Sequence, residues 1–191
     1  MVIYIHGFSG SGQGSKAKAF RKYYKEKGED FIAPSLSYVP ELAINTLEEL
    51  IESYNEDVTL IGSSLGGYYA IYLAQKYNLP AVLLNPSIYP YDTLSRCLGK
   101  APSFYDESSF EWMKTHIDML RNYDIKEPKQ NNIMLLVQKG DELLNFQEAV
   151  DKFPDAQVIA EEGGSHSFEG IENYFDKIRS FLTSNKEHSN W

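Results

Sequence analysis

Residues 58–69 read VTLIGSSLGGYY, a short apolar run followed by glycines and serines. The run 58–61 predicts a buried strand, and the apolar residues that recur at helical spacing just after this stretch predict a helix. Gly62 and Gly66 stand two residues on either side of Ser64. This Gly-x-Ser-x-Gly spacing is typical of a sharp strand-to-helix turn that exposes a nucleophilic serine.

The position of this pentapeptide matters more than its composition. A chain of this length and glycine and serine content would contain the pattern by chance in roughly one case in ten. Its placement directly between a strand and a helix makes Ser64 the preferred hydroxyl. Ser63 is the rival, but it lies one residue before the apex of the turn and is expected to point elsewhere.

The rest of the chain alternates between strand and helix patterns. Further strands are expected at 2–6, 31–33, 81–84, 133–137 and 157–159, and helices after Ser15, after Pro40, near 70–77 and over 171–182. Strands that are apolar on both faces and separated by helices imply a parallel sheet covered on both sides. The expected fold class is α/β, a three-layer α/β/α sandwich around a mostly parallel sheet of about six strands. Ligands bind at the carboxyl ends of such strands.

Length and charge limit the classes of function. The 191 residues predict a single domain, 1–191. Eighteen basic against 27 acidic residues give a net charge of −9, which repels phosphate backbones and anionic headgroups, so neither nucleic acid nor membrane is expected as a partner. Neither a signal peptide nor a membrane-spanning stretch is apparent, and a lone Cys97 cannot form an internal disulfide. A cytoplasmic setting is expected, with Cys97 as a small buried side chain.

About residues 86–131 the alternation stops. This interval contains four prolines. It is expected to hold no strand, and a helix is expected to begin at a capping box from Ser108 to Glu111. The apolar residues of this helix would occupy two of its faces, which is more apolar surface than packing on the sheet requires. The interval of about 86–131 is therefore expected to be a small inserted helical lid, whose extra apolar face could cover a substrate pocket. Packing of both faces on neighbouring helices is an equally open alternative.

A serine nucleophile needs a base, and in chains with this turn the order is serine, then an acid, then histidine. Three histidines follow Ser64: His116 in the inserted helix, His166 after the sixth strand, and His188 in a tail expected to fray. Only His166 follows a strand of the sheet, in a loop with glycines that can bend over the sheet edge. His166 is therefore the expected base.

The acid is expected after the fifth strand, where Gly140 precedes Asp141 and Glu142. Asp141 is preferred over Glu142. Capping of the next helix does not require Asp141, because Asn145 already offers a cap there. Oxyanion donors are expected from the amide after the nucleophile, Leu65, and from the loop after the first strand, Phe8.

Several of these motifs occur together in a recognisable order: His6-Gly-Phe8, the Ser64 turn, Asn85-Pro86, Gly140-Asp-Glu142 and Glu162-Gly-Gly-Ser-His-Ser-Phe168. In this respect the chain resembles, over nearly its whole length, the small YqiA-type esterases of the α/β-hydrolase superfamily. The resemblance implies a compact fold without the usual first two strands, hydrolysis of carboxylic esters and of acyl thioesters as a further class, and Ser64, Asp141 and His166 as a catalytic triad. The individual substrate does not carry over.

Two other functions are weighed. Gly12, Gly14 and Ala17 formally match Gly-x-Gly-x-x-Ala before a helix, but Gly12 lies too far beyond the first strand for a nucleotide-binding module. A hydrolase-like binding protein that is catalytically silent stays open. The sequence has neither His-Glu-x-x-His nor paired cysteines, so a metal and a cofactor are not expected. The expected partner is a small-molecule ester or thioester, the oligomeric state is open, and His6 is expected to be structural.

Overall fold

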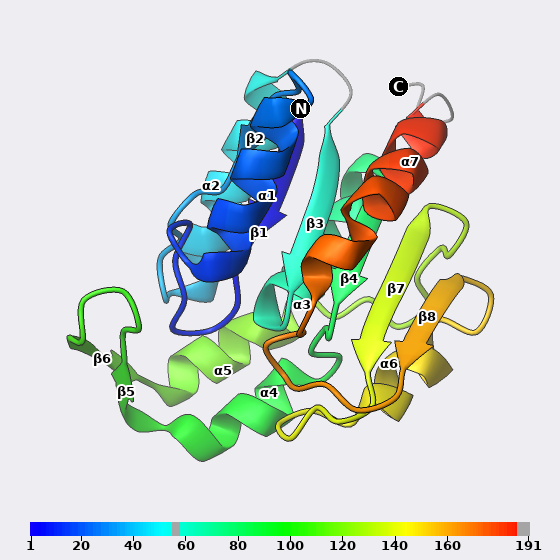
Figure 1. Ribbon diagram of the computed structural model, residues 1–191. Helices are drawn as coiled ribbons and strands as arrows, with labels where there is room; N and C mark the ends of the chain where they lie inside the picture. The colour runs from blue at the N-terminus through cyan, green and yellow to red at the C-terminus, as the bar shows by residue number, and fades with distance from the viewer. Residues whose placement is uncertain (55–57, 187–191) are drawn as a thin grey trace.

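The computed structural model describes residues 1–54 and 58–186. His188 and the rest of the predicted tail beyond Lys186 lie outside these residues. Six strands form one sheet in the order β2-β1-β3-β4-β7-β8, and every neighbouring pair is parallel (Figure 1). Their bounds are β1 Val2–Ile5, β2 Phe31–Ile32, β3 Thr59–Ser63, β4 Ala81–Leu84, β7 Ile133–Gln138 and β8 Gln157–Glu161. The predicted parallel sheet is confirmed.

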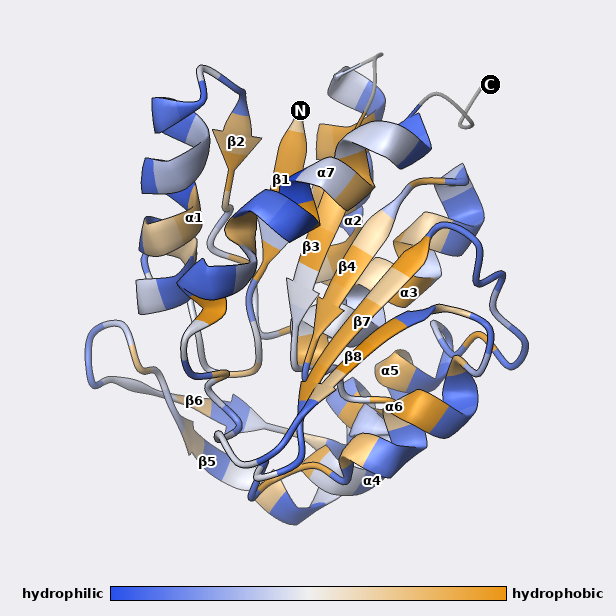
Figure 2. Ribbon diagram, turned by 45° about the vertical axis from the view of Figure 1, so that its right-hand side comes forward, coloured by the Kyte–Doolittle hydropathy of each residue, from blue (hydrophilic) through white to orange (hydrophobic). Residues whose placement is uncertain are grey.

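Helices cover both faces of this sheet, as the apolar runs predict. They are α1 Ser15–Glu26, α2 Pro40–Ser53, α3 Leu65–Tyr77, α6 Phe146–Lys152 and α7 Phe175–Lys186, with the 3₁₀ turn η2 Ile171–Tyr174 before α7. Successive strand residues point to opposite faces, so each strand feeds two cores. On one face Val82 and Leu84 pack with α1 and α7, and on the other Ala81 and Leu83 pack with α2, α3 and α6. Figure 2 shows the hydrophobic strands enclosed between helices with hydrophilic outer faces.

The segment between β4 and β7 differs from the expectation. It holds the short helix α4 Pro90–Thr93, the 3₁₀ turn η1 Leu94–Cys97, strands β5 Gly99–Pro102 and β6 Ser109–Trp112, and helix α5 Lys114–Arg121. The strands β5 and β6 pair as an antiparallel hairpin apart from the main sheet, and Figure 1 shows this hairpin at the lower left, next to α5. The prediction of an interval without strands is therefore wrong.

The capping box predicted at Ser108 is also absent. The Ser108 hydroxyl donates to the Asp106 carboxylate at 2.7 Å and so stabilises the hairpin turn instead of a helix start. Helix α5 begins at Lys114, where the His116 ring accepts the Met113 amide. Four residues are too few to distinguish a strand from a helix by apolar spacing, so the pairing with β5 decided the outcome.

The apolar face of α5 has a structural partner. Ile117 and Leu120 are buried in the core shared with α2 and α3, and the Leu120 carbonyl accepts the hydroxyl of Tyr68 on α3 at 2.7 Å. For this face of the helix, the alternative of packing on neighbouring helices is therefore the one observed. Cys97, expected to be buried, is exposed at the end of η1, a turn without buried residues. Within the described residues, every helix is too short or too polar to span a bilayer.

Candidate active site

The turn between β3 and α3 places Ser64 at the carboxyl edge of the sheet. Ser64 has φ 56° and ψ −121°, a backbone conformation that non-glycine residues rarely adopt. The turn is tight: a Cβ on Gly62 would lie 2.3 Å from the Gly66 carbonyl oxygen, and a Cβ on Gly66 would lie 2.1 Å from the Ile5 carbonyl oxygen. Only glycine fits at both positions, which explains the spacing found in the sequence.

Three side chains expected from the sequence meet at this edge. His166 Nε2 lies 3.0 Å from Ser64 Oγ, and His166 Nδ1 lies 2.8 Å from Asp141 Oδ2. Because a neutral imidazole has one donor and one acceptor nitrogen, donation from Nδ1 to the carboxylate leaves Nε2 free to accept the serine proton. The arrangement can therefore activate the Ser64 hydroxyl.

Asp141 is held as a carboxylate that faces His166. Its side chain is only 2% exposed, and its Oδ1 accepts the amides of Leu143 and Leu144 at 2.9 and 2.8 Å. Burial alone would raise the pKa of this carboxyl, but the hydrogen bonds from His166, Leu144 and Leu143 outweigh it and lower the pKa below the ordinary value. Asp141 thus stays charged at neutral pH and orients the imidazole.

Glu142, the carboxylate that the sequence ranked second, has another position. Its Oε2 accepts the backbone amide of His166 at 3.0 Å, and this bond lowers the pKa of the Glu142 carboxyl. Glu142 therefore binds the backbone of the loop after β8 that carries His166, called here the histidine loop, whereas the imidazole ring bonds to Asp141 and Ser64.

Asn85 positions the histidine loop through hydrogen bonds, a role that the sequence analysis did not predict. It follows β4 with a positive φ of 39°, and its side chain donates to the carbonyls of Ser165 and His166 at 2.9 and 3.2 Å. Its Oδ1 accepts the amide of Gln138 at the end of β7. The sequence does contain a signal for this role, namely a polar residue directly after an apolar strand at a place where burial is expected.

Gln138 braces the same loop from the next strand. Its amide nitrogen donates to the Glu169 carbonyl, and its oxygen accepts the amides of Ser165 and Glu169 at 3.1 and 2.8 Å. The side chain is 3% exposed, so these bonds form in a low-dielectric setting where they fix the loop strongly. The imidazole position therefore depends on residues from two central strands.

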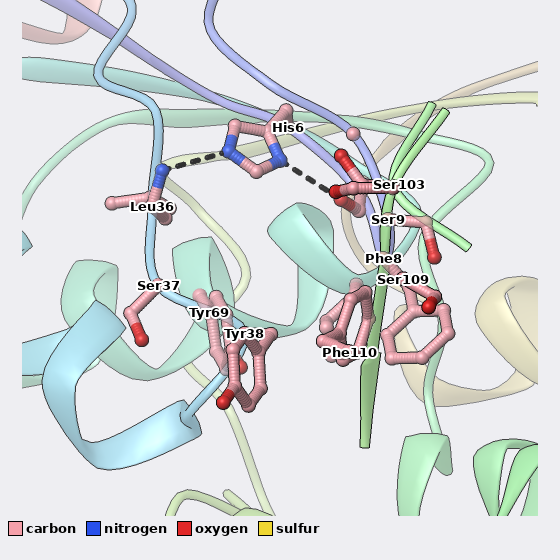
Figure 3. Close-up of a pocket in the computed structure, with 14 residues that line it drawn as sticks. His6, Phe8, Ser9, Leu36, Ser37, Tyr38, Tyr69, Ser103, Ser109 and Phe110 are labelled. Carbon is pink, nitrogen blue, oxygen red and sulfur yellow. Dashed lines mark hydrogen bonds between the residues drawn. The ribbon is translucent and has the colours of Figure 1, made fainter. Parts of the chain in front are cut away.

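The loop after β1 lies beside Ser64. The amides of Phe8 and Leu65 donate to no acceptor within the described residues, whereas the Ser64 amide is paired with the Leu84 carbonyl at 3.1 Å. His6 fixes this loop: its Nε2 accepts the Leu36 amide at 3.0 Å and its Nδ1 donates to the Gly7 carbonyl at 2.8 Å (Figure 3). This is the structural position expected for His6.

Two cavities flank the loop after β1. The first, called here the serine cavity, has a volume of about 520 Å³ and is lined by Ser64 and His166, the start of α1, and Phe104 and Tyr105 of the hairpin. The second, the aromatic cavity, has a volume of about 290 Å³ and is lined by Leu65, Tyr69, Tyr38 and Phe110 (Figure 3). Gly7 and Phe8 line both. Within the described residues, no group of three or more metal-ligating side chains is present.

Comparison with other proteins agrees with this architecture. A family model described as "Uncharacterised protein family (UPF0227)" matches residues 1–183. Among curated relatives, the UPF0227 protein YcfP of Escherichia coli O9:H4 is 21% identical over 96% of this chain and 99% of its own length. The UPF0227 protein YE1706 of Yersinia enterocolitica is 23% identical over the same shares.

Solved structures resemble the chain at the level of the fold. Mouse alpha/beta hydrolase domain-containing protein 10 has a TM-score of 0.76 at 18% identity, covering 96% of this chain and 89% of its own. Est1E of Butyrivibrio proteoclasticus, solved with ferulic acid, has a TM-score of 0.77 at 12% identity and corresponding shares of 96% and 88%. A monoacylglycerol lipase of Paleococcus ferrophilus has a TM-score of 0.70 at 16% identity, with 96% and 94%. The chain has the α/β-hydrolase fold, and the resemblance drawn from its motifs is confirmed at that level.

Proposed function

We propose that this chain, which belongs to the UPF0227 family, is a serine hydrolase that cleaves carboxylic esters, with acyl thioesters as a further class of substrate. The observation that carries the proposal is the continuous hydrogen-bonded series from Ser64 through His166 to Asp141, of which Ser64 and His166 line the serine cavity. Geometry and roles identify such a triad on any fold. The esterase and lipase among the solved structures above support the proposal only through their fold.

The first step is attack by Ser64 Oγ on the carbonyl carbon of the ester while His166 Nε2 takes the hydroxyl proton. Asp141 stabilises the imidazolium that forms. The carbonyl oxygen becomes an oxyanion, and the unpaired amides of Phe8 and Leu65 are the donors that would stabilise it.

In the second step, the tetrahedral intermediate collapses. The carbonyl carbon loses its bond to the alcohol or thiol, which leaves with the proton held on His166, and the acyl group stays on Ser64. Water then attacks the acyl-enzyme with His166 again as the base, releasing the acid and restoring the Ser64 hydroxyl. Atoms and protons balance with water as the only other reactant.

A catalytically silent binding protein of this fold would need an occluded site. Instead, Ser64 lines an open cavity, and the His166 side chain is 19% exposed. The strained backbone of Ser64 also favours catalysis, since such conformations concentrate at active sites.

Labelling with a fluorophosphonate probe tests the proposal. The probe is expected to modify the wild-type chain once, and Ser64→Ala to abolish both labelling and cleavage of p-nitrophenyl acetate. Ser63→Ala is the matched control, because it removes the neighbouring buried hydroxyl and should still be labelled. Turnover retained by a folded Ser64→Ala chain, or no labelling of folded wild type, would contradict the proposal.

A further inference from the structure

The serine cavity and the aromatic cavity differ in which residues of the proposed reaction line them. His166 lines the serine cavity and is absent from the aromatic one, whereas Leu65 lines only the aromatic cavity. Since the imidazolium must donate its proton to the departing alcohol or thiol, the leaving group has to lie on the side of His166. The leaving group is therefore assigned to the serine cavity.

The acyl group then extends in the other direction. Gly7 lies beside the nucleophile, since a Cβ built on it would be 3.5 Å from Ser64 Oγ, and it lines both cavities. Gly7 therefore lies between the nucleophile and the aromatic cavity, and an acyl chain that extends away from His166 would pass Gly7 to reach this cavity. There Tyr38 and Phe110 stack with ring centroids 4.5 Å apart, which offers an apolar wall.

The serine cavity has the opposite character. Although the chain carries 27 acidic and 18 basic residues, the described residues that line this cavity include Lys16 and Lys18 and no aspartate or glutamate. A cavity whose lysines are not balanced by a lining carboxylate concentrates anions locally, even in an acidic protein. The charge of the leaving group is therefore expected to be negative.

Of the two lysines, Lys16 is the better candidate to bind an anionic group of the substrate. Lys16 is partly buried, and within the described residues the one hydrogen bond of its side chain is donation from Nζ to the Ser167 carbonyl at 2.7 Å. None of the ion pairs among the described residues includes Lys16. Burial lowers the pKa of the ammonium group, and the charge of Asp141 opposes this, but that carboxylate is already bonded to His166. An ammonium has three donors, so two stay available for a ligand.

The first turn of α1 adds to this positive field. Residues from Gly14 to Lys18 line the cavity, the first helical turn contains no acidic residue, and the first backbone bond of the helix joins the Lys18 amide to the Gly14 carbonyl. The preceding amides at 15–17 lack intrahelical partners. A helix of 12 residues carries a partial positive charge at this end.

We infer that the substrate has an apolar acyl group and an alcohol or thiol part that carries an anionic group, a carboxylate or a phosphate, which Lys16 binds in the serine cavity. The inference rests on the proposed function. It places the charge on the leaving group and not on the acyl chain, because His166 and Lys16 share one cavity.

A matched pair of esters tests the charge. The neutral ester is o-nitrophenyl butanoate, and the charged one is the butanoate ester of 3-hydroxy-4-nitrobenzoate, which adds one carboxylate to the same nitrophenol. Each kcat/KM is divided by the rate of the uncatalysed hydroxide reaction. The charged ester is expected to be preferred about tenfold, the gain typical of one charge-assisted hydrogen bond in a partly solvated site. Added salt should reduce this preference.

Variants of Lys16 test the assignment to a residue. Lys16→Gln keeps a side chain able to donate to the Ser167 carbonyl but removes the charge, and it should cancel most of the preference, while Lys16→Arg should restore it. Lys22→Gln is the matched control, because it removes one charge from an exposed position of the same helix that does not line the cavity, and the preference should persist. A purely structural Lys16 would lower both rates equally and leave their ratio unchanged, which would overturn the inference.

Two further substrate comparisons test on which side of the ester the anionic group binds and whether it is a carboxylate or a phosphate. A carboxylate at the end of the acyl chain, in o-nitrophenyl hydrogen adipate compared with o-nitrophenyl hexanoate, should give no gain, and a gain there would overturn the assignment of sides. A phosphate leaving group, followed through release of butanoate from 3-(butanoyloxy)phenyl phosphate, distinguishes phosphate from carboxylate. Cleavage of o-nitrophenyl butanoate without any charge preference would sink this inference alone, whereas its cleavage by folded Ser64→Ala would sink the proposed function.

Discussion

His166 Nε2 lies 3.0 Å from Ser64 Oγ, although the two residues are 102 positions apart in the chain. The sheet order explains this, because the loop after β8 crosses the ends of β7 and β4 before it reaches Ser64 at the end of β3. Gln138, the last residue of β7, and Asn85, which follows β4, form hydrogen bonds with this loop. The proposed chemistry therefore depends on contacts from four parallel strands.

Removal of the base or of its orienting acid should affect turnover strongly. His166→Ala is expected to lower kcat by about 10³-fold or more, and Asp141→Asn by somewhat less, since an orienting group can be partly replaced. Steady-state kinetics with p-nitrophenyl acetate provide the measurement. Glu142→Gln is the matched control, because this carboxylate accepts the backbone amide of His166 and not a ring nitrogen. A larger loss in Glu142→Gln than in Asp141→Asn would reverse their assigned roles.

Asp141 should make stability depend on pH in a defined direction. Its pKa is lower in the folded chain than the value of about 3.9 expected when unfolded, so the folded state favours the charged form. That stabilisation is present above about pH 4 and is lost as the pH falls through the folded pKa. Urea unfolding of wild type and Asp141→Asn should show a difference in unfolding free energy that is largest near neutrality and shrinks in acid. A difference that grew on acidification would contradict the assignment.

The tight turn at Ser64 predicts an asymmetry among glycines. Gly66→Ala would place a Cβ 2.1 Å from the Ile5 carbonyl oxygen, and the strand and helix must separate to accept it, at a cost of about 2 kcal/mol or more. At Gly14, the N-cap of α1, a Cβ would meet only the Ser11 carbonyl oxygen at 3.4 Å, so Gly14→Ala should cost less than about 1 kcal/mol. Chemical denaturation measures both, and equal costs would show that the turn can relax.

Two buried asparagines allow the positioning role of Asn85 to be separated from stability. Asn85→Ala should cost about 1–3 kcal/mol of unfolding free energy and also lower kcat about tenfold, because the histidine loop loses its support. Asn132→Ala removes a buried amide that donates to the Leu79 carbonyl at 2.7 Å and makes no bond to the histidine loop. It should lose stability with little change in kcat. Equal effects of both variants on kcat would show that Asn85 acts only through stability.

The wall of the aromatic cavity should set the preferred acyl length. Phe110→Ala removes a ring stacked on Tyr38 and enlarges the 290 Å³ cavity, so longer acyl chains should gain relative to acetate. A panel of p-nitrophenyl esters of increasing acyl length measures this shift. Tyr54→Ala, at an exposed aromatic residue at the C-terminal end of α2, is the control and should leave the profile unchanged. An unchanged profile in Phe110→Ala would place the acyl chain elsewhere.

Expectations from the sequence were most accurate where the pattern was long or sterically strict. The six main strands and the helices between them follow from runs of apolar residues, and the spacing of Gly62, Ser64 and Gly66 follows from a turn in which Cβ atoms would clash. The hairpin of β5 and β6 was missed because each of its strands has only four residues. Such short runs take their conformation from the partner strand, which local spacing does not reveal.

By itself, the sequence determined the parallel sheet, the turn at Ser64 and the identity of the few residues able to act with it, since these depend on local apolar periodicity and on steric limits at glycine. Only the tertiary structure decided that Asp141 and not Glu142 meets the imidazole, that Asn85 and Gln138 carry the histidine loop, and that Lys16 shares a cavity with Ser64. The physical reason is that hydrogen bonds and cavities depend on distances between segments far apart in the chain, and those distances are fixed only when the strands pack into one sheet.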